Sequence, residues 1–590
     1  MKPMRKVYAL ISALLLIGMT ACQGNSPGPG ESASQSEGTA SSVEIPTSSG
    51  EPKFGGTLTV GGRWSTTEPP GWFVQEAPSV AALFYINPYQ EFLITGDVLN
   101  KGPRGTNEGS YGVYQAELPE NLLIGNLAES WEATTDPLGV KLKVRPGVMW
   151  TGNDNIGMAP REYTAEDMAY VINSYIESAK ADKVGNFMSP GAAKVLDDST
   201  VQIEFDKPFA SWSWVLGYVL YSNHFPKEMV EADPYDWRNA VGTGPFILTD
   251  YIAGSVVNYK RNDNWWGKNQ VVNGTTYEAP FIDELSLPIF GDEATMISAL
   301  RAGKIDILDY VSPNYKETLA KTSPDLLYME NASGMSLNMV FNQLSGPLQD
   351  RELRRAIMLG TDQDAIAAAI PGSNAGGFPF SESLGETIYT PPNEMPEDIA
   401  KLFTYNPEEA AQTIKDLGYE GETITIHYMS SVAEQVAAAE LLEYQWSQIG
   451  LNVSLNVVDP AVHAGYNTGK GEEWSGVLLQ NGGNCRTSRG IENEREKPYL
   501  SVHTDKWFNE QMDKMMAEPD GNIRDKIMKE AGVYFIGQVD EIALVEMTTL
   551  TYWWPWVKNY YGEVDVGSTN MNPMLATLWI DQELKKSMGF

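Results

Sequence analysis

The sequence of 590 residues is poor in histidine, in cysteine and in positive charge, and each shortage excludes a class of function. The four histidines are widely spaced and form no HxxxH pair, so the sequence predicts no zinc site and no other metal. Lysines and arginines number 42 against 77 aspartates and glutamates, which gives a formal net charge of −35. A nucleic acid needs a basic surface, and we therefore predict no nucleic-acid partner.

Catalytic signatures are also missing from the sequence. It has no GxSxG, no P-loop and no HExxH, so the common serine hydrolase, nucleotide-binding and metalloprotease patterns are absent. Carboxylates are abundant, but no spacing singles out a pair for glycoside cleavage. We predict that the protein is not an enzyme and uses no cofactor. A secreted hydrolase or an adhesion scaffold is the less favoured alternative.

The sequence lacks a long hydrophobic run near its start. Val7–Met19 is apolar but too short for a comfortable membrane span, and three cations precede it: Lys2, Arg5 and Lys6. The run ends in Met-Thr-Ala followed by Cys22, and small residues before a cysteine in this position resemble a bacterial lipobox. The resemblance implies cleavage before Cys22 and acylation of its sulfur and its new amine. Several acyl chains together anchor a protein stably to a membrane.

We therefore predict a lipoprotein signal peptide over residues 1–21 and an extracytoplasmic protein that is lipid-anchored to the cell membrane, at the cell surface or in the periplasm. The alternative is an ordinary signal peptide with an incidental cysteine. Residues 22–53 are rich in Ser, Gly, Pro and Glu and predict a flexible tether. If Cys22 carries lipid, Cys485 has no partner and no internal disulfide can form.

What the sequence does contain is the composition of a globular protein. Hydrophobic residues make up 42% and aromatic residues 11% of the chain, and 590 residues exceed the size at which one core stops growing. Two or three lobes are therefore expected. Residues 127–210 predict a compact α+β subdomain, with alternation at Val140, Leu142 and Val144 and with a helix that Thr164 and Asp167 can cap.

Residues 241–268 predict a hairpin at a tight crossing of the chain. Gly242-Thr243-Gly244-Pro245-Phe246 combines two glycines, which tolerate φ > 0, with a stiff proline. Strands are expected over residues 246–248 and 255–260, joined by a turn at Ala253-Gly254 and closed by Asn264-Trp265-Trp266.

The chain has α/β character from residue 406 onward. Asn406-Pro407 predicts a helix start, residues 423–428 predict a strand, and Ser431 with Glu434 predicts a capping box for a helix that ends at Gly450. A strand over residues 452–458 completes a strand–helix–strand unit, which implies a parallel pair. Residues 505–538 are expected to be helical, and Ile542–Met547 to form an apolar strand.

A series of motifs, taken together, resembles the family 5 extracellular solute-binding proteins of ABC importers, of the oligopeptide and dipeptide type. Each motif is weak alone, but their order and spacing over some 300 residues behind a lipobox are specific. The motifs are Gly55–Leu58 (GGTL), Leu127–Glu132 (LAESWE), Thr164–Asp167 (TAED), Gly242–Phe246 (GTGPF), Asn264–Trp266 (NWW), Leu300–Ile307 (LRAGKIDI) and Asp350–Ile357 (DRELRRAI).

The resemblance implies a mixed α/β (α+β) fold of the type II periplasmic-binding-protein kind, with two lobes, a hinge and a ligand enclosed between the lobes. The chain would cross the hinge near Val340 and return near Val545. The expected boundaries are 54–99, 241–338 and 545–590 for the first lobe, 100–240 for its inserted subdomain, and 339–544 for the second lobe. The implied partners of this expected monomer are a small-molecule ligand and the permease subunits of an ABC importer, which respond to closure.

The stretch that would recognise the ligand departs from the family pattern. Many peptide binders of the family have an Asp-rich loop that grips the α-amino group of the peptide, but the corresponding stretch here, Glu473–Arg486, contains no aspartate. Asn481, Asn484 and Arg486 offer amide and guanidinium groups that suit hydroxyls or a carboxylate. With 16 tryptophans in the chain, an oligosaccharide is the alternative to a peptide.

The predicted ligand contacts combine this loop with tryptophans near the hinge and the first strand. Trp64 follows the first strand, at whose carboxyl end a cleft is expected, and Trp553 and Trp554 follow the return strand. Core packing is the alternative role for each of these rings. The full prediction comprises Trp64, Asn481, Asn484, Cys485, Arg486, Trp553 and Trp554, with burial as a small residue the default for Cys485.

Overall fold

A computed structural model describes most of the chain from residue 50 onward. The described residues are 50–66, 69, 71–76, 81–97, 123–178, 187–218, 222–272, 274–376, 387–483, 505–563 and 572–590. They belong to one unit, which begins at Val43. The signal peptide, Cys22 and nearly all of the tether lie outside the described residues, as do Asn484, Cys485 and Arg486. No helix in the described ranges is long and apolar enough to cross a membrane.

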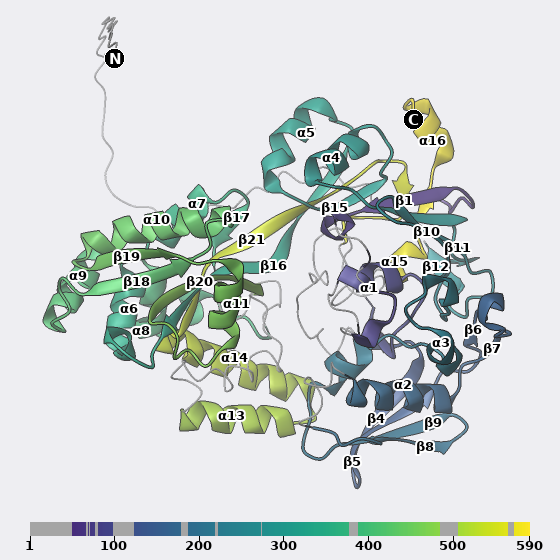
Figure 1. Cartoon of the computed structure of the whole chain (residues 1–590), viewed down its shortest axis with the longest axis horizontal. Coiled ribbons are helices and arrows are strands. Elements are labelled where there is room, and N and C mark those ends of the chain that lie inside the picture. The colour runs from purple at the N-terminus through teal and green to yellow at the C-terminus, as the bar shows by residue number, and fades with distance from the viewer. Residues whose placement is uncertain are drawn as a thin grey trace, which may run out of the picture. The chain divides into compact units, whose positions relative to one another are not determined.

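An eleven-stranded mixed sheet organises the described part of the chain (Figure 1). Along the sheet the strands are β10 (Phe246–Ile252), β11 (Val256–Arg261), β14 (Glu284–Pro288), β1 (Thr57–Gly61), β15 (Ile307–Val311), β21 (Glu541–Trp553), β16 (Leu327–Asn342), β20 (Gly476–Gly483), β18 (Thr423–Tyr428) and β19 (Asn452–Val457). The short strand β17 (Ser373–Ala375) pairs with β21.

Two long strands, β16 and β21, connect the two halves of this sheet. Near one end of the pair, Ile307 of β15 lies opposite Trp553 of β21. Near the other end, Val340 of β16 lies opposite both Leu478 of β20 and Glu541 of β21. Figure 1 shows both strands running from the neighbourhood of β15 to that of β20. Residues 541–553, expected as a strand ending at Met547 with an aromatic run beyond it, form one continuous strand.

The hairpin expected over residues 241–268 is present as β10 and β11 in antiparallel register. A Cβ on Gly242 would collide with the carbonyl oxygen of Tyr89, and Gly244 N–H donates to the same oxygen at 3.0 Å. Neither glycine has a positive φ. The tight crossing is therefore confirmed, but close backbone approach rather than a left-handed conformation is what requires glycine here.

A separate four-stranded sheet and one helix form the expected α+β region. Its order is β4 (Ala128–Thr135), β5 (Leu138–Val144), β9 (Thr200–Glu204) and β8 (Ala193–Asp197), and α2 (Ala165–Glu177) packs on β8 and β9. The predicted capping box between Thr164 and Asp167 is present. Asp167 also pairs with Arg161, with 2.7 Å between Oδ2 and Nη1.

Short elements complete this half of the molecule. The helices are α1 (Ala81–Ile86), α3 (Lys227–Ala232), α4 (Glu293–Arg301), α5 (Lys316–Thr322), α15 (Asn572–Leu575) and α16 (Gln582–Ser587). The strands are β2 (Ile94–Gly96), β3 (Leu123–Gly125), β6 (Met149–Trp150), β7 (Arg161–Glu162), β12 (Asn269–Val272), β13 (Thr275–Glu278), β22 (Val557–Lys558) and β23 (Trp579–Ile580).

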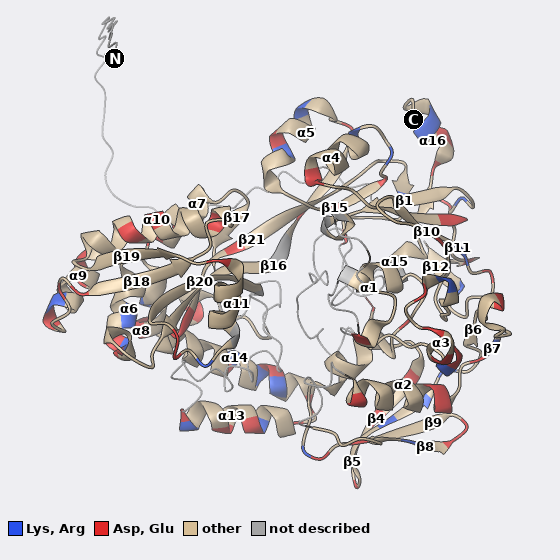
Figure 2. Ribbon diagram, viewed as in Figure 1, with Lys and Arg blue, Asp and Glu red and all other residues tan. Residues whose placement is uncertain are grey.

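The other half has α/β character. Its helices are α6 (Arg351–Leu359), α7 (Gln363–Ala369), α8 (Glu397–Ala400), α9 (Pro407–Asp416), α10 (Ala433–Gln448), α11 (Pro460–Thr468), α13 (Lys506–Ala517) and α14 (Gly521–Gln538). The unit β18–α10–β19 is a parallel pair, as predicted. Side chains of α6, α7, α9 and α10 pack with Leu337 and Val545 in a hydrophobic core of their own. Aspartates and glutamates are scattered over both halves rather than gathered in one place (Figure 2).

The predicted capping box at Ser431 is wrong. Helix α10 begins at Ala433, its N-cap is Val432, and no side chain caps it. This start places Gln435, not Glu434, at the third helical position, and the Gln435 side chain accepts a hydrogen bond from Met429 N–H at 2.8 Å. The helix start is shifted by one residue, because that amide contact favours a turn before the helix.

Candidate functional site

Two neighbouring rows of residues cross the sheet where β20, β16, β21 and β17 lie side by side. In the first row Asn481, Leu337, Val545 and Ala375 are register partners. In the second row the partners are Gly482, Ser336, Glu546 and Asn374. We call these the cross-sheet rows. Strands lie about 4.8 Å apart, so each row is about 14 Å long.

The rows lie near the hinge crossings that the family resemblance implies. The expected second hinge crossing, near Val545, falls in the first row. The expected first crossing, near Val340, lies three residues beyond Leu337 along β16. Leu337 and Val545 are fully buried in the core that α6, α7, α9 and α10 cover. The sheet is therefore rigidly packed on that face at this position.

Buried polar side chains tie β16, β20 and β21 together beside the rows. Ser336 Oγ lies 2.5 Å from Asn338 Oδ1, and Asn338 Nδ2 donates to Glu541 Oε1 at 2.9 Å. Gln480 Nε2 donates to the same oxygen at 3.3 Å. Because each of these side chains is nearly or fully buried, the network fixes the relative position of the three strands.

One end of the rows lies at a switch in strand order. The chain runs from β18 to β19 on one side of β18 and then to β20 on the other, and both neighbours are parallel to β18. In open α/β sheets such a reversal leaves a crevice at the carboxyl ends of the strands, where ligands bind. Asn481 lies in that place, near the carboxyl end of β20.

Gln435 orients Asn481 at this switch. Gln435 is fully buried, and its Nε2 donates to Asn481 Oδ1 at 2.9 Å while its Oε1 accepts from Met429 N–H. With Oδ1 engaged by Gln435, the Nδ2 amide of the exposed Asn481 is the group that can donate to a ligand.

His427 stands next to the end of β18 and has a structural role. Its Nε2 donates to Ser475 O at 2.8 Å, and its Nδ1 accepts from Asn456 Nδ2 at 2.8 Å. Burial lowers the pKa of His427, so the ring is neutral near pH 7.

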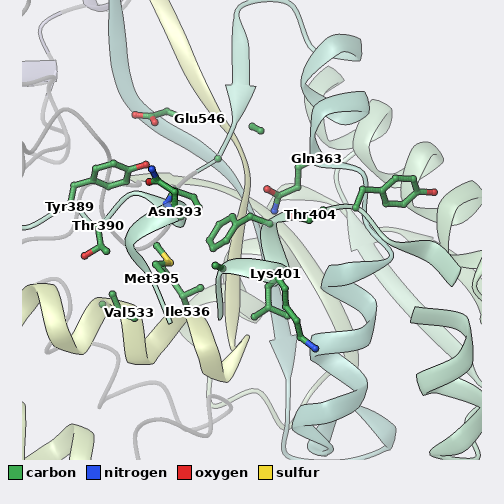
Figure 3. Close-up of a pocket in the computed structure, with 18 of the residues that line it drawn as sticks. Gln363, Tyr389, Thr390, Asn393, Met395, Lys401, Thr404, Val533, Ile536 and Glu546 are labelled. Carbon is green, nitrogen blue, oxygen red and sulfur yellow. The ribbon is translucent and has the colours of Figure 1, made fainter. Parts of the chain in front are cut away.

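A cavity of about 770 Å³ adjoins the other end of the rows (Figure 3). Asn374, Ala375 and Glu546 from the rows form part of its wall. The opposite walls come from α7, from residues 388–405 and from α14, and include Gln363, Thr390 and Ile536. Its volume lies in the range of pockets that hold small ligands.

The predicted tryptophan contacts are buried in the other half of the sheet. Trp553 is fully buried, and its ring meets that of Tyr560 edge-on at 5.2 Å. Trp554 stacks on Trp556 at 4.6 Å and donates from Nε1 to Leu300 O at 2.9 Å. Trp64 is 4% exposed and stacks on Phe84 at 5.3 Å.

The structure does not bring these rings to Asn481. Eight residues separate Val545, in the row of Asn481, from Trp553 along β21, which corresponds to about 26 Å. Their role as ligand contacts stays a prediction, and so does the role of Asn484, Cys485 and Arg486. Within the described ranges no group of three or more His, Cys, Asp or Glu side chains is arranged to hold a metal ion.

Sequence reasoning did not identify Gln435, Gln363, Thr390 or Glu546. They come from α10, α7, a loop and β21, and only strand pairing and helix packing bring such segments together. No local spacing in the sequence marks any of them.

The family model "Bacterial extracellular solute-binding proteins, family 5 Middle" matches residues 123–487. Heme-binding protein A of Haemophilus influenzae is 24% identical over 353 residues, covering 56% of this chain and 60% of that protein. The dipeptide-binding protein of Escherichia coli is 24% identical over 362 residues, covering 56% and 63%. The matches thus span about 60% of the length of these curated relatives.

Solved structures share the fold over most of the described chain. The ABC transporter substrate-binding protein CtaP of Listeria monocytogenes superposes with a TM-score of 0.68 at 17% identity, covering 90% of this chain and all of that one. HbpA2 of Haemophilus parasuis gives 0.69 at 17% identity, covering 89% and 100%. DppA of Helicobacter pylori in complex with the peptide STSA gives 0.63 at 16% identity, covering 90% and 99%. The predicted mixed α/β fold of the type II periplasmic-binding-protein kind is confirmed.

Proposed function

Because the chain belongs to the bacterial extracellular solute-binding proteins of family 5, we propose that it captures an oligopeptide-type ligand outside the cytoplasm and delivers it to an ABC importer. The observation that carries the proposal is the family match over residues 123–487 together with a fold shared with a peptide-bound relative. Binding and release of a solute, without chemical turnover, is the activity that this membership supports.

In this proposal the ligand binds between two lobes that close over it. The first lobe comprises residues 54–99, 241–338 and 545–590, with the subdomain 100–240 inserted, and the second comprises 339–544. The continuous strands β16 and β21 support a hinge, because they belong to both halves of the sheet. A micromolar ligand supplies about −8 kcal/mol, which shifts the population toward the closed form that the permease subunits recognise.

The proposed contact surface is the switch-point end of the cross-sheet rows. Asn481 offers its amide nitrogen there, and Gln435 holds it in place. Asn484, Cys485 and Arg486 follow three to five residues later in the sequence and are proposed as further contacts. Trp64, Trp553 and Trp554 are buried, so a contact to ligand from any of them requires a movement of the surrounding side chains.

The protein is further proposed to act as a monomer held to the membrane by lipid on Cys22. The sequence before Cys22 supports this anchor, and so does the Ser- and Gly-rich stretch that follows it. An oligosaccharide ligand is not favoured, because the predicted contacts Trp64, Trp553 and Trp554 are covered by protein and several relatives are named for peptides.

Calorimetric titration tests the function. We expect saturable one-to-one binding of short peptides to the full chain, with the peptide recovered intact after prolonged incubation. Binding of oligosaccharides but not peptides would contradict the ligand class. Cleavage of the bound peptide would contradict the transport role.

A further inference from the structure

We propose that the cavity beside β17 accepts one uncharged, apolar residue of the bound peptide, and that Gln363 and Thr390 hydrogen-bond the amide of that residue. This inference rests on the proposed function. It adds a side-chain specificity that the peptide-binding activity by itself does not require.

Two polar atoms on the cavity wall are buried and unsatisfied. Gln363 Nε2 and Thr390 Oγ1 each lack a hydrogen-bond partner in the structure. Gln363 belongs to the first turn of α7 and Thr390 to the loop that precedes α8, so they approach the cavity from different elements (Figure 3). Buried donors without partners are uncommon in folded proteins, and a ligand that supplies an acceptor removes their cost.

The chemistry of these two groups defines what they bind. An amide nitrogen can only donate, whereas a hydroxyl can donate and accept. A ligand group that satisfies both must present a hydrogen-bond acceptor such as a carbonyl oxygen, and it can also offer an N–H to Thr390. The peptide amide has both features in one unit.

The remaining walls favour an apolar side chain. Ile388, Met395, Leu402 and Ile536 line the cavity, and each is at most 9% exposed. A side chain that displaces water from these walls gains in proportion to the apolar area that it buries.

The charges around the cavity disfavour a carboxylate. Acidic residues outnumber basic ones in its wall: Asp362, Asp364, Glu397 and Glu546 against Lys401 and Lys529. Lys401 is paired with Glu409, with 3.2 Å between Nζ and Oε1, and does not add free positive charge. An acidic side chain or the carboxyl terminus of a peptide therefore fits worse than an internal neutral residue.

The cavity adjoins the β17 end of the cross-sheet rows. Asn374 and Glu546 belong both to the cavity wall and to the second row. Asn481, at the β20 end of the first row, lies about 14 Å from β17 across the sheet.

The experiment is a scan of alanine-based pentapeptides in which one position at a time carries leucine or glutamate, titrated calorimetrically into the full chain. We expect one position at which leucine binds about tenfold tighter than alanine and glutamate binds more weakly. Val533→Trp, which fills the cavity from α14, should abolish the preference at that position while the other positions are unchanged. Gln363→Leu should weaken every peptide about fivefold through the lost hydrogen bond.

Gln412→Leu provides a matched control, because Gln412 is exposed on α9 and lies outside the cavity wall. If Val533→Trp fails to fold, Thr390→Val replaces it as the second test variant, because valine keeps the side-chain volume and removes the hydroxyl. A flat leucine scan in a parent that binds peptides would overturn this inference and leave the proposed function standing. A parent that binds no pentapeptide would overturn both.

Discussion

The indole Nε1 of Trp266 donates a hydrogen bond to Glu91 Oε2 at 2.8 Å, and this contact joins two residues that are 175 positions apart. Trp265 donates in the same way to Oε1 at 3.2 Å. The guanidinium of Arg145 lies 4.7 Å from the centre of the Trp266 ring. The two indoles at the end of the hairpin thus both bind one buried carboxyl group.

The first prediction concerns the pH dependence that this carboxyl imposes. Burial raises the pKa of Glu91 to about 7, although the hydrogen bonds from Trp266 and Trp265 and the charge of Arg145 oppose the shift. The folded state therefore binds a proton on Glu91 more tightly than the unfolded state does, so the contribution of this group to stability is greatest below about pH 4.5 and is lost as pH rises through 7. The free-energy change is at most about 3 kcal/mol.

Glu91→Gln tests this sign, because glutamine does not titrate. At pH 5 the variant should melt below the parent, since an amide cannot accept from both indoles. At pH 8 the deficit should shrink or reverse. Burial also raises the pKa of Asp309 to about 7, so both proteins lose some stability with pH and only their difference is diagnostic. A difference in melting temperature that is constant from pH 5 to pH 8 would contradict the account.

The second prediction concerns the ion pair between Arg354 and Asp540. Arg354 Nη2 lies 3.0 Å from Asp540 Oδ1, and the two side chains are 1% and 0% exposed. Arg354→Met removes the cation beside a buried carboxylate and should lower the free energy of unfolding by about 3–5 kcal/mol in denaturant titrations. Arg351→Met breaks an exposed pair with Glu352 on the same helix and should cost less than about 1 kcal/mol. Equal losses of unfolding free energy in the two variants would show that the buried ion pair stabilises the fold no more than the exposed one.

The third prediction concerns Gln435 as the residue that positions Asn481. Gln435→Leu removes the partner of Asn481 Oδ1 and of Met429 N–H, so the amide of Asn481 loses its fixed orientation. We expect peptide affinity to fall about tenfold in calorimetry. Gln448→Leu, an exposed change at the far end of α10, should leave the affinity unchanged. Unaltered affinity in Gln435→Leu would remove Asn481 from the proposed contact surface.

The fourth prediction concerns the lipid anchor. Cys22→Ser removes the sulfur that is proposed to be acylated, so the protein should move from the membrane fraction to the medium or the soluble envelope fraction. Cys485→Ser should stay with the membrane, because it leaves the lipobox intact. Retention of Cys22→Ser on membranes at the level of the parent would show that lipid on this cysteine is not the anchor.

Local sequence patterns predicted the local structure well. The capping contacts of Thr164 and Asn406 lie within three residues of their partners, and both helices begin where expected. The parallel pair β18 and β19 followed from the strand–helix–strand order. The capping prediction at Ser431 failed because Gln435, one residue beyond the Ser-x-x-Glu pattern, accepts a hydrogen bond from Met429 N–H instead.

Long-range pairing was the part that the sequence could not specify. The register that aligns Gly482, Ser336, Glu546 and Asn374 depends on four separate segments, and no spacing within any segment encodes it. Asn481 was identified because it lies in the stretch that departs from the family pattern, although that stretch forms strand β20 as far as Gly483. Gln363 and Thr390 were not, because an amide on a helix and a threonine in a loop are unremarkable until a cavity lies beside them.

The central claim is that this chain is a receptor for peptides, and native mass spectrometry of the protein as purified tests it most directly. The intact protein should carry a population of heavier species, and denaturation should release peptides that tandem spectra can sequence. Released sugars would contradict the claim. So would a protein that carries nothing and gains no mass from a mixture of short peptides.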